Sequence, residues 1–314
     1  MTFGIGSFNT HYFEDASNNF RYKEQLQLLK SVNLDVVALL EVYHPVHINR
    51  SHRNKNKDQK KISVLDHFSK NLGMKYIFHE YHRRYGIAIF SSYKILHSKT
   101  FIIKDTMFGK RGIVMITVSL KEKYKINSLD ENEENEKEEE KEEEKEKKKE
   151  KEEKEEEELE TIDIFAVHID HRLETTRLKQ MKVVWKFINE NKRSERYVLV
   201  GDFNCLSSPS HYPKNEWRSL VEVRKKNSWE SPRVDVYNSI IEKGLIDTWG
   251  LRKKKILHHQ GTCFYKTRID YIFSSPEFLI DSGPYLVTYK KVDTESSDHN
   301  LVYVEGKIPK NDKK

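Results

Sequence analysis

Short runs of apolar, largely β-branched residues recur along the chain and predict strands. Runs of this length, bounded by turn residues, are typical of buried strands. Two runs, 111–120 and 161–169, also show the partial alternation of strands with one buried face. The clearest of the others are residues 3–9, 34–42, 85–92, 197–201, 267–275 and 300–308.

Apolar residues at helical spacing predict helices between these strands. The clearest stripe consists of Leu178, Met181, Val184, Trp185 and Ile188. Strands outnumber helices and several follow one another directly, which disfavours a simple Rossmann sheet. We therefore expect two packed sheets with helices on the outside. The helical segments are residues 21–32, 63–72 (closed by Gly73), 175–191 and 235–249.

A Glu- and Lys-rich segment, residues 128–160, separates the runs 111–120 and 161–169. It has no apolar face, so we interpret it as disordered or as a solvated helix. Because both flanks have strand character, we expect a hairpin with an expanded tip, and therefore one domain over residues 1–308. Inert surface filler is favoured over a specific role, so deletion of Glu131 to Glu158 should leave activity nearly intact.

Charge is distributed unevenly. The 314-residue chain has a net charge of +6, but Asp130–Glu160 holds 20 acidic residues and 8 lysines, which leaves +18 on the other 283 residues. A basic folded part suits a polyanion, such as nucleic acid or a phosphorylated metabolite or lipid. Because the chain is rich in Lys and Asn throughout, compositional bias is a competing explanation, and charge serves as supporting evidence only.

The cysteine content and the hydropathy of the chain indicate the cellular compartment in which we expect the protein. The two cysteines, Cys205 and Cys263, favour a reducing environment and are best explained as small buried hydrophobes. The sequence shows neither an apolar run of about 18 residues nor a leader, so we expect an intracellular protein, cytoplasmic or nuclear, without a transmembrane segment. Nothing in the sequence indicates a stable protein partner.

Two polar residues, Asp202 and Asn204, flank Phe203 directly after the strand 197–201. Side chains alternate along a strand, so the two polar groups should share one face while Phe203 packs inward. A turn is an equally good explanation at this point, because Asp and Asn favour turns.

Polar residues stand at the ends of most other predicted strands as well. Strand ends on one edge of a sheet meet in space, so these groups can share one cleft. Mg²⁺ prefers oxygen ligands and is commonly held by one or two carboxylates plus a phosphate, whereas no Cys/His grouping has zinc spacing. Glu41 with Asn9, opposite Asp298 or Asp202, forms such a set, although a lone Glu41 is equally explained as a rim charge. The strand-end residues are Asn9, Glu41, His168, Asp202, Asn204, Asp270, Asp298 and His299.

Seven motifs carry a resemblance to a known family. In order they are "SFN", "LLEV", "YGIAIFSS", "VHIDHR", "VGDFN", "RIDYIFSS" and "SSDHN". From Phe3 to Glu305, outside the charged segment, the chain resembles the endonuclease/exonuclease/phosphatase superfamily of Mg²⁺-dependent phosphoesterases. The resemblance implies a DNase I-like, four-layer α/β (α+β) sandwich of two mixed β-sheets between helices.

The resemblance also implies roles for the strand-end residues. Asn9, Glu41 and Asp298 would hold Mg²⁺, for which Mn²⁺ is a substitute, and His168 would contact the scissile phosphate. Asp202 and Asn204 would align the water and the transition state. The residues themselves already indicate that His299 can act as a base if Asp270 holds its far nitrogen.

Residues around "HIDHRLETTRLKQ" are candidates for substrate binding. The stretch is similar to the "HLDH" stretch of a group of hydrolases within the superfamily, in which Arg177 and Gln180 match an Arg and a Gln. An alternative role, tying down a loop, is favoured for those two residues over catalysis. The candidate phosphate-binding residues are Arg111, His171, Arg172 and Arg177.

Three loops mix basic and aromatic residues beside the predicted site: 44–61, 80–86 and 207–235. They suit a phosphate backbone and stacked bases, and solvated basic loops are the equally weighted alternative. We therefore expect a phosphodiesterase acting on nucleic acid, either RNA or DNA. A phosphatase or phosphodiesterase for a small phosphoester or a lipid headgroup is the second hypothesis, and a non-catalytic scaffold is the third.

Overall fold

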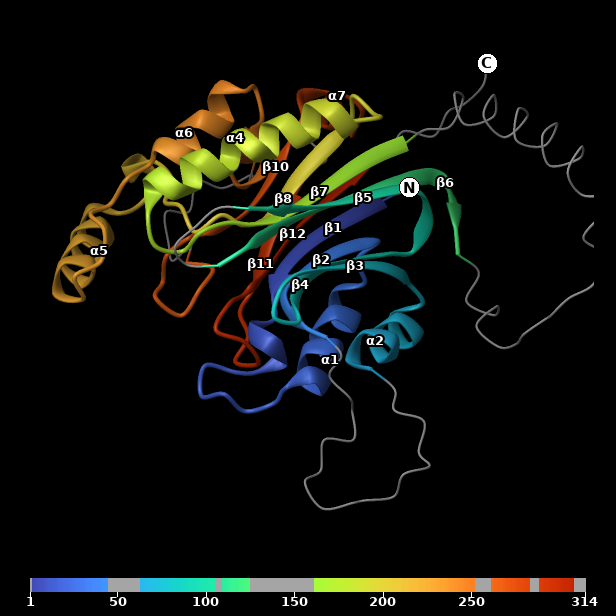
Figure 1. Ribbon diagram of the computed structural model, residues 1–314, viewed down its shortest axis with the longest axis horizontal. Helices are drawn as coiled ribbons and strands as arrows, with labels where there is room; N and C mark the ends of the chain where they lie inside the picture. Colours follow the sequence, from blue (N-terminus) through green and yellow to red (C-terminus); the bar gives the residue numbers. More distant parts are fainter. Residues whose placement is uncertain are drawn as a thin grey trace, which may run out of the picture.

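Two six-stranded β-sheets pack face to face, and helices cover their outer faces (Figure 1). The computed structural model describes residues 2–44, 63–104, 109–124, 161–251, 261–282 and 288–307. This arrangement confirms the predicted four-layer α/β sandwich. The charged segment 128–160 and most of the loop 44–61 lie outside the described residues.

The first sheet is mixed, because β1 runs parallel to β2 and antiparallel to β12. Its strands, in spatial order, are β11 (Thr288–Val292), β12 (Leu301–Lys307), β1 (Thr2–Asn9), β2 (Val36–Tyr43), β4 (Tyr85–Ser91) and β3 (Lys75–His82).

The second sheet is also mixed, with β7 parallel to β8 and antiparallel to β6. The pairing of β6 with β7 confirms the predicted hairpin on either side of the charged segment. In spatial order the strands are β5 (Tyr93–Ile103), β6 (Arg111–Lys123), β7 (Thr161–His168), β8 (Tyr197–Asp202), β10 (Asp270–Ser274) and β9 (Ile246–Asp247).

Alternation of side chains along the strands builds three hydrophobic layers. Phe3, Ile5 and Ile164 lie in the core between the sheets. Phe8 faces the helices outside the first sheet, and Phe165 faces those outside the second. The central strands are therefore buried on both sides, which explains their nearly continuous apolar sequences.

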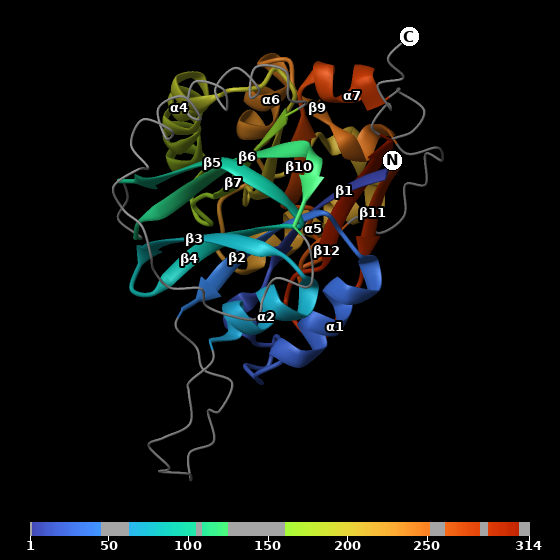
Figure 2. The same ribbon diagram turned by 90° about the vertical axis from the view of Figure 1, so that its right-hand side faces the viewer.

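Helices cover each sheet as the apolar stripes predict (Figures 1 and 2). On the first sheet lie α1 (Tyr22–Val32) and α2 (Val64–Leu72), and Gly73 ends α2 with a left-handed φ of 66°. On the second lie α4 (Glu174–Asn191) and α6 (Asp235–Glu242), with α7 (Pro276–Ser282) beside them. Helix α5 (Lys214–Lys226) lies at one end of the sandwich (Figure 1).

Several of the described elements were missing from the sequence prediction, namely β3, β5, β9, β11, α5 and α7. The predicted helix 235–249 was too long, because α6 ends at Glu242 and Ile246–Asp247 form β9. Strands β3 and β5 each occupy one edge of a sheet, and most of their side chains are partly or fully exposed, so no apolar run marks them. The expected loop 207–235 contains α5, of which only Leu220 is buried. Elements with little buried surface leave little hydrophobic pattern.

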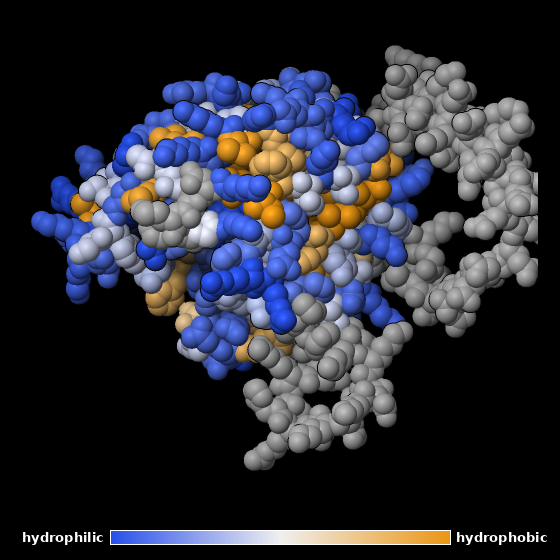
Figure 3. Space-filling model, viewed as in Figure 1, coloured by the Kyte–Doolittle hydropathy of each residue, from blue (hydrophilic) through white to orange (hydrophobic). Residues whose placement is uncertain are grey.

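The surface and the thiols agree with the composition. Cys205 and Cys263 are both free and buried, which confirms their interpretation as small hydrophobes. Hydrophobic residues form separate patches among hydrophilic ones on the face shown in Figure 3. Within the described ranges, no helix is long and apolar enough to cross a membrane.

Candidate active site

Three strands of the second sheet bring polar residues into one row. Asp202 at the end of β8 lies opposite His168 of β7 and opposite Asp270 of β10. Gly201 allows this close pairing: its φ is 144°, and a Cβ at this position would lie 1.9 Å from the Val167 carbonyl oxygen. The "GD" pair therefore combines a backbone that only glycine tolerates with a carboxylate placed at the strand end.

The first sheet contributes Asn9 and Glu41 from its parallel strands β1 and β2. The pairing of β2 with β4 shifts register between Leu39 and Val42, and Glu41 within this bulge has a left-handed φ of 50°. Bulges re-aim side chains, and strained non-glycine backbone concentrates at functional sites. The bulge explains why Glu41 reaches the cleft although its neighbours are buried in the core.

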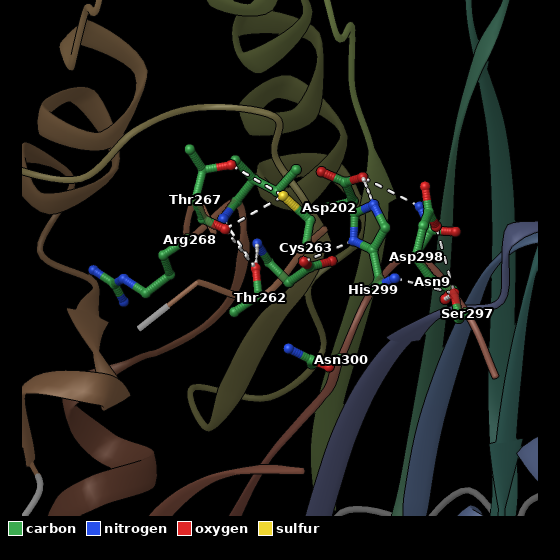
Figure 4. Close-up of polar contacts among 12 residues, drawn as sticks. Asn9, Asp202, Thr262, Cys263, Thr267, Arg268, Ser297, Asp298, His299 and Asn300 are labelled. Carbon is green, nitrogen blue, oxygen red and sulfur yellow. Dashed lines mark hydrogen bonds and ion pairs between the residues drawn. The ribbon is translucent and has the colours of Figure 1, made fainter. Parts of the chain in front are cut away.

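Asp202 lies at the centre of the site (Figure 4). Its Oδ2 atom accepts a hydrogen bond of 3.2 Å from Asn9 Nδ2 and lies 3.8 Å from both His168 Nε2 and His299 Nε2. Burial raises the pKa of Asp202 to about 7, and the negative charges of Asp270 and Glu41 add to this effect while His299 opposes it. Asp202 is therefore both buried and influenced by two further carboxylates.

A hydrogen bond of 2.9 Å joins His299 Nδ1 to Asp270 Oδ2, as the sequence predicts. Burial lowers the pKa of His299, but attraction to Asp270, their hydrogen bond and Asp202 outweigh burial and raise it well above its usual value. His299 is therefore charged at neutral pH in this arrangement. A cation beside the carboxylates would reduce that attraction and favour the neutral ring that a base requires.

The His168 ring is held by a residue that the sequence did not point to. Tyr81 Oη lies 3.0 Å from His168 Nδ1, and both side chains are buried. Nε2 faces two carboxylates, Glu41 at 3.7 Å and Asp202 at 3.8 Å, which favours a proton on Nε2 and makes Nδ1 the acceptor for Tyr81. Burial, with Arg111 and two other histidines, lowers the pKa of His168 well below its usual value, so the ring is neutral.

The donor set fits a divalent cation. Ligand atoms of Glu41, His168 and Asp202 lie within 4.8 Å of one another. Asp298 lines the same cleft, with Oδ1 3.9 Å from His11 Nδ1. The amide oxygen of Asn9 already accepts a bond from the His11 backbone N–H, which leaves one lone pair for a further partner. A hard cation would offset the carboxylate charges that, after burial, raise the pKa of Asp202.

Asn204 combines the two explanations that the sequence left open. Its left-handed φ of 48° ends the strand, and its backbone N–H donates to Asp202 Oδ1 at 2.9 Å, as in a turn. Its side chain also lines the cleft and donates to the Ile169 carbonyl. Phe203, by contrast, packs into the core beneath α4.

Most of the site residues line a cleft of about 1240 Å³, and only Asn9 and Asp270 do not; the lining ones are Glu41, His168, Asp202, Asn204, Asp298 and His299. Of the four candidate phosphate-binding residues, Arg111, His171 and Arg172 line it, and Arg111 Nη2 lies 3.1 Å from His171 Nδ1. Arg177 does not: it is 2% exposed and its guanidinium is occupied by Glu174 and Glu230. Its position therefore favours the alternative role of tying down a loop and corrects the assignment to substrate binding.

Sequence reasoning also missed residues of the 3-10 turn His11–Phe13, which has three consecutive left-handed residues. Tyr12 lines the cleft, and burial together with the charge of Glu41 raises the pKa of its phenol. A search for polar residues at strand ends does not find Tyr12, because Tyr12 lies in the turn that follows the strand. The left-handed backbone of this turn is formed by residues other than glycine, so no glycine marks it in the sequence. Tyr81 lies inside an edge strand, so the same search does not find it either.

The fold and the site together define the class of DNase I-like hydrolases that act on phosphoester bonds. The chain matches the Endonuclease/Exonuclease/phosphatase family over residues 6–299 and belongs to it. Members of this family generally use divalent metal ions. The comparison with curated protein sequences finds no match.

Solved structures of this fold are similar at low sequence identity. An endonuclease/exonuclease/phosphatase from Beutenbergia cavernae has a TM-score of 0.60 at 14% identity, covering 98% of this chain and 72% of its own. A mannosyl-6-phosphatase from Bacteroides thetaiotaomicron has a TM-score of 0.58 at 15% identity, covering 98% and 100%. D. rerio TDP2, complexed with a single strand DNA product, has a TM-score of 0.57 at 15% identity, covering 98% and 99%.

Proposed function

We propose that this protein is a Mg²⁺-dependent phosphodiesterase that hydrolyses nucleic acid. The observation that carries the proposal is the convergence of Glu41, His168, Asp202 and His299 in one cleft, with Asp270 bonded to His299. We further propose that residues 1–308 form one catalytic domain. The pairing of β1, near the start of the chain, with β12, near its end, supports this.

In this proposal Glu41, Asn9 and Asp298 hold the metal, with Asp202 beside them. When bound, Mg²⁺ would polarise the phosphoryl oxygens and offset charge that develops in the transition state. Mn²⁺ would substitute for it. This assignment predicts that Glu41→Gln weakens Mg²⁺ binding at least about ten-fold in titration calorimetry. Glu195→Gln is the control, because Glu195 pairs with Lys192 in solvent.

The protein's own residues would divide the remaining work. His168 Nε2–H donates to a phosphoryl oxygen, while Asp202 and Asn204 orient the attacking water. The water oxygen bonds to phosphorus, its proton passes to the Asp202–His299 pair, and the bond from phosphorus to the ester oxygen breaks. The departing oxygen then takes a proton from solvent, and the Asp202–His299 pair returns its proton to solvent. Asp270 holds the ring of His299 through Nδ1.

Charge favours nucleic acid as the substrate. Residues outside Asp130–Glu160 carry +18, and Arg83 and Arg84 form the tight turn between His82 and Tyr85, two cleft-lining residues. Neutralising both arginines should reduce the salt dependence of binding to single-stranded RNA or DNA, by a slope of about 0.7 per lost phosphate contact. Lys94→Gln is a control, because Lys94 pairs with Glu122 and does not line the cleft. An unchanged slope in the double variant would contradict the electrostatic argument.

A small phosphoester is the second candidate, since the mannosyl-6-phosphatase has the same fold. The two candidates differ in which compound is turned over. If the protein hydrolyses nucleic acid, mannose 6-phosphate should be a poor substrate and a weak competitor. Efficient release of phosphate from mannose 6-phosphate, with oligonucleotides only weakly inhibitory, would instead support the second candidate.

A further inference from the structure

Exposed hydrophobic side chains gather at the cleft. Eight large hydrophobic side chains are exposed among the described residues, and five of them line the cleft: Leu173, Val223, Trp229, Phe264 and Tyr265. The three aromatic ones, here called the aromatic rim, are 41%, 68% and 58% exposed, respectively. A group of this kind at a cleft marks a contact surface, because single scattered hydrophobics would not converge there.

The ring of Tyr265 contacts the other two rings edge to face. The centroids of Trp229 and Tyr265 are 5.0 Å apart with an interplanar angle of 90°, and those of Phe264 and Tyr265 are 5.5 Å apart at 84°. In each contact the edge of one ring meets the face of the other, and a large part of each side chain remains exposed. An exposed aromatic ring can stack on a further planar ring.

Ion pairs and hydrogen bonds hold the loop that carries Trp229. Its neighbour Glu230 pairs with Arg177 at 2.9 Å and accepts bonds of 2.9 and 3.0 Å from the Glu174 backbone N–H. Arg224 Nε donates to the Glu230 carbonyl at 2.6 Å, and the Trp229 N–H donates to the Arg224 carbonyl at 2.9 Å. The loop that carries Trp229 is therefore fixed although its ring is exposed.

The other side of the rim is joined to the catalytic strand ends. The Phe264 N–H donates to the Asp298 carbonyl at 2.7 Å, and Cys263 forms a β-bridge with His299. Lys266 closes the turn with a left-handed φ of 59° and an N–H bond to the Cys263 carbonyl at 2.8 Å. Phe264 and Tyr265 are thus placed a fixed short distance from the catalytic groups.

Cations accompany the aromatic rim. Arg172, Arg224 and Lys266 line the same cleft, and its volume of about 1240 Å³ exceeds the 300–1,000 Å³ or so that is typical of small-molecule sites. Flat aromatic faces with interspersed cations are the combination that binds unpaired nucleotides, through base stacking and phosphate contacts. A base inside a duplex keeps both faces stacked and cannot meet these rings.

We infer that the aromatic rim is a stacking subsite for an unpaired nucleobase next to the scissile phosphate, so that the preferred substrate is single-stranded or has an unpaired end. This inference rests on the proposed function and names its substrate class. It assigns Trp229, Phe264 and Tyr265 to base binding and gives Arg177 a positioning role through Glu230.

Binding of a short single-stranded oligonucleotide that contains the fluorescent base 2-aminopurine tests the inference, with Ca²⁺ in place of Mg²⁺. Trp229→Ala and Tyr265→Ala should each weaken binding between about 5-fold and about 150-fold, as measured for other base-aromatic stacks. Trp229→Phe retains a flat ring and should recover most of the affinity. Phe101→Ala is the matched control: Phe101 is 44% exposed but packs on Phe187 and does not line the cleft.

An abasic oligonucleotide of the same length separates stacking from phosphate binding. The losses in Trp229→Ala and Tyr265→Ala should be confined to the base-containing probe. Equal losses on both probes, or wild-type affinity for both, would overturn the inference. So would mannose 6-phosphate binding that depends on the rim, because the rim would then be a sugar subsite.

Activity measurements keep this inference separate from the proposed function. If the wild-type protein cleaves oligonucleotides and Trp229→Ala does so with an unchanged KM, the stacking subsite is refuted while the proposed function stands. If the rim-dependent binding is found but no oligonucleotide is cleaved with Mg²⁺, the proposed function fails while the subsite stands.

Discussion

Replacing Arg177 with methionine removes the cation at the centre of a buried ion network. Arg177 is 2% exposed and Glu174 is fully buried. The guanidinium donates to Glu174 at 2.8 Å, to Glu230 at 2.9 Å and to the Asp170 carbonyl at 3.2 Å. Methionine fills a similar volume, so the substitution tests the charge and hydrogen bonds and leaves little cavity.

The expected loss of stability follows from the two carboxylates that remain in the variant. Without Arg177, the carboxylates of Glu174 and Glu230 lose their shared cation inside the protein. Removing one partner of a buried pair costs about 3–5 kcal/mol. At roughly 2–4 °C per kcal/mol, the value for domains of about 150–250 residues, Tm should fall by roughly 6–20 °C. Single-stranded oligonucleotide binding should weaken as well, because Glu230 anchors the loop of Trp229.

Urea denaturation measures the change in the free energy of unfolding, and thermal scanning measures the change in Tm. Arg233→Met is the control, because Arg233 pairs with Asp235 in solvent and should contribute far less. The reasoning is refuted if Arg177→Met unfolds with the wild-type free energy and yet fails to bind substrate. That result would restore a direct contact between Arg177 and the substrate.

Three further predictions address the site. Tyr81→Phe removes the hydroxyl 3.0 Å from His168 Nδ1 and should lower kcat about 10–100-fold with an unchanged far-ultraviolet circular dichroism spectrum; a wild-type kcat would show that the ring needs no such support. Asp270→Asn should lower kcat by at least about 10²-fold, since it disturbs the 2.9 Å bond that holds His299, and a KM effect alone would contradict that role. Gly201→Ala places a Cβ 1.9 Å from a β7 carbonyl at a φ of 144° and should destabilise the protein by at least about 3 kcal/mol in urea titrations; a neutral effect would mean that β7 and β8 can separate freely.

Buried strands were predictable because burial on both faces leaves a long apolar run. Strand β8 and strand β4 are of this kind, and the helical stripe of α4 was equally clear. The edge strands β3 and β5 and helix α5 were not predictable, because their side chains are largely exposed. Pattern reasoning detects burial, so it fails where an element buries little.

The candidate site was predictable as far as it lies on strand ends. Asp202, His168 and Asp270 occupy one row of the second sheet, as expected for adjacent strands. No sequence pattern indicated the contacts that form only when distant parts of the chain come together. Tyr81 lies within an edge strand, and Phe264 and Tyr265 meet Trp229 only after the chain has folded.

Cleavage of end-labelled oligonucleotides tests the central claim most directly. Single-stranded RNA, single-stranded DNA and duplex DNA are incubated with Mg²⁺, alongside a chelator control and the His299→Ala variant. The account predicts cleavage, faster for single strands, that both controls abolish while the variant remains folded. A folded wild-type protein that binds Mg²⁺ but cleaves none of them, or cleavage that survives His299→Ala, would contradict it.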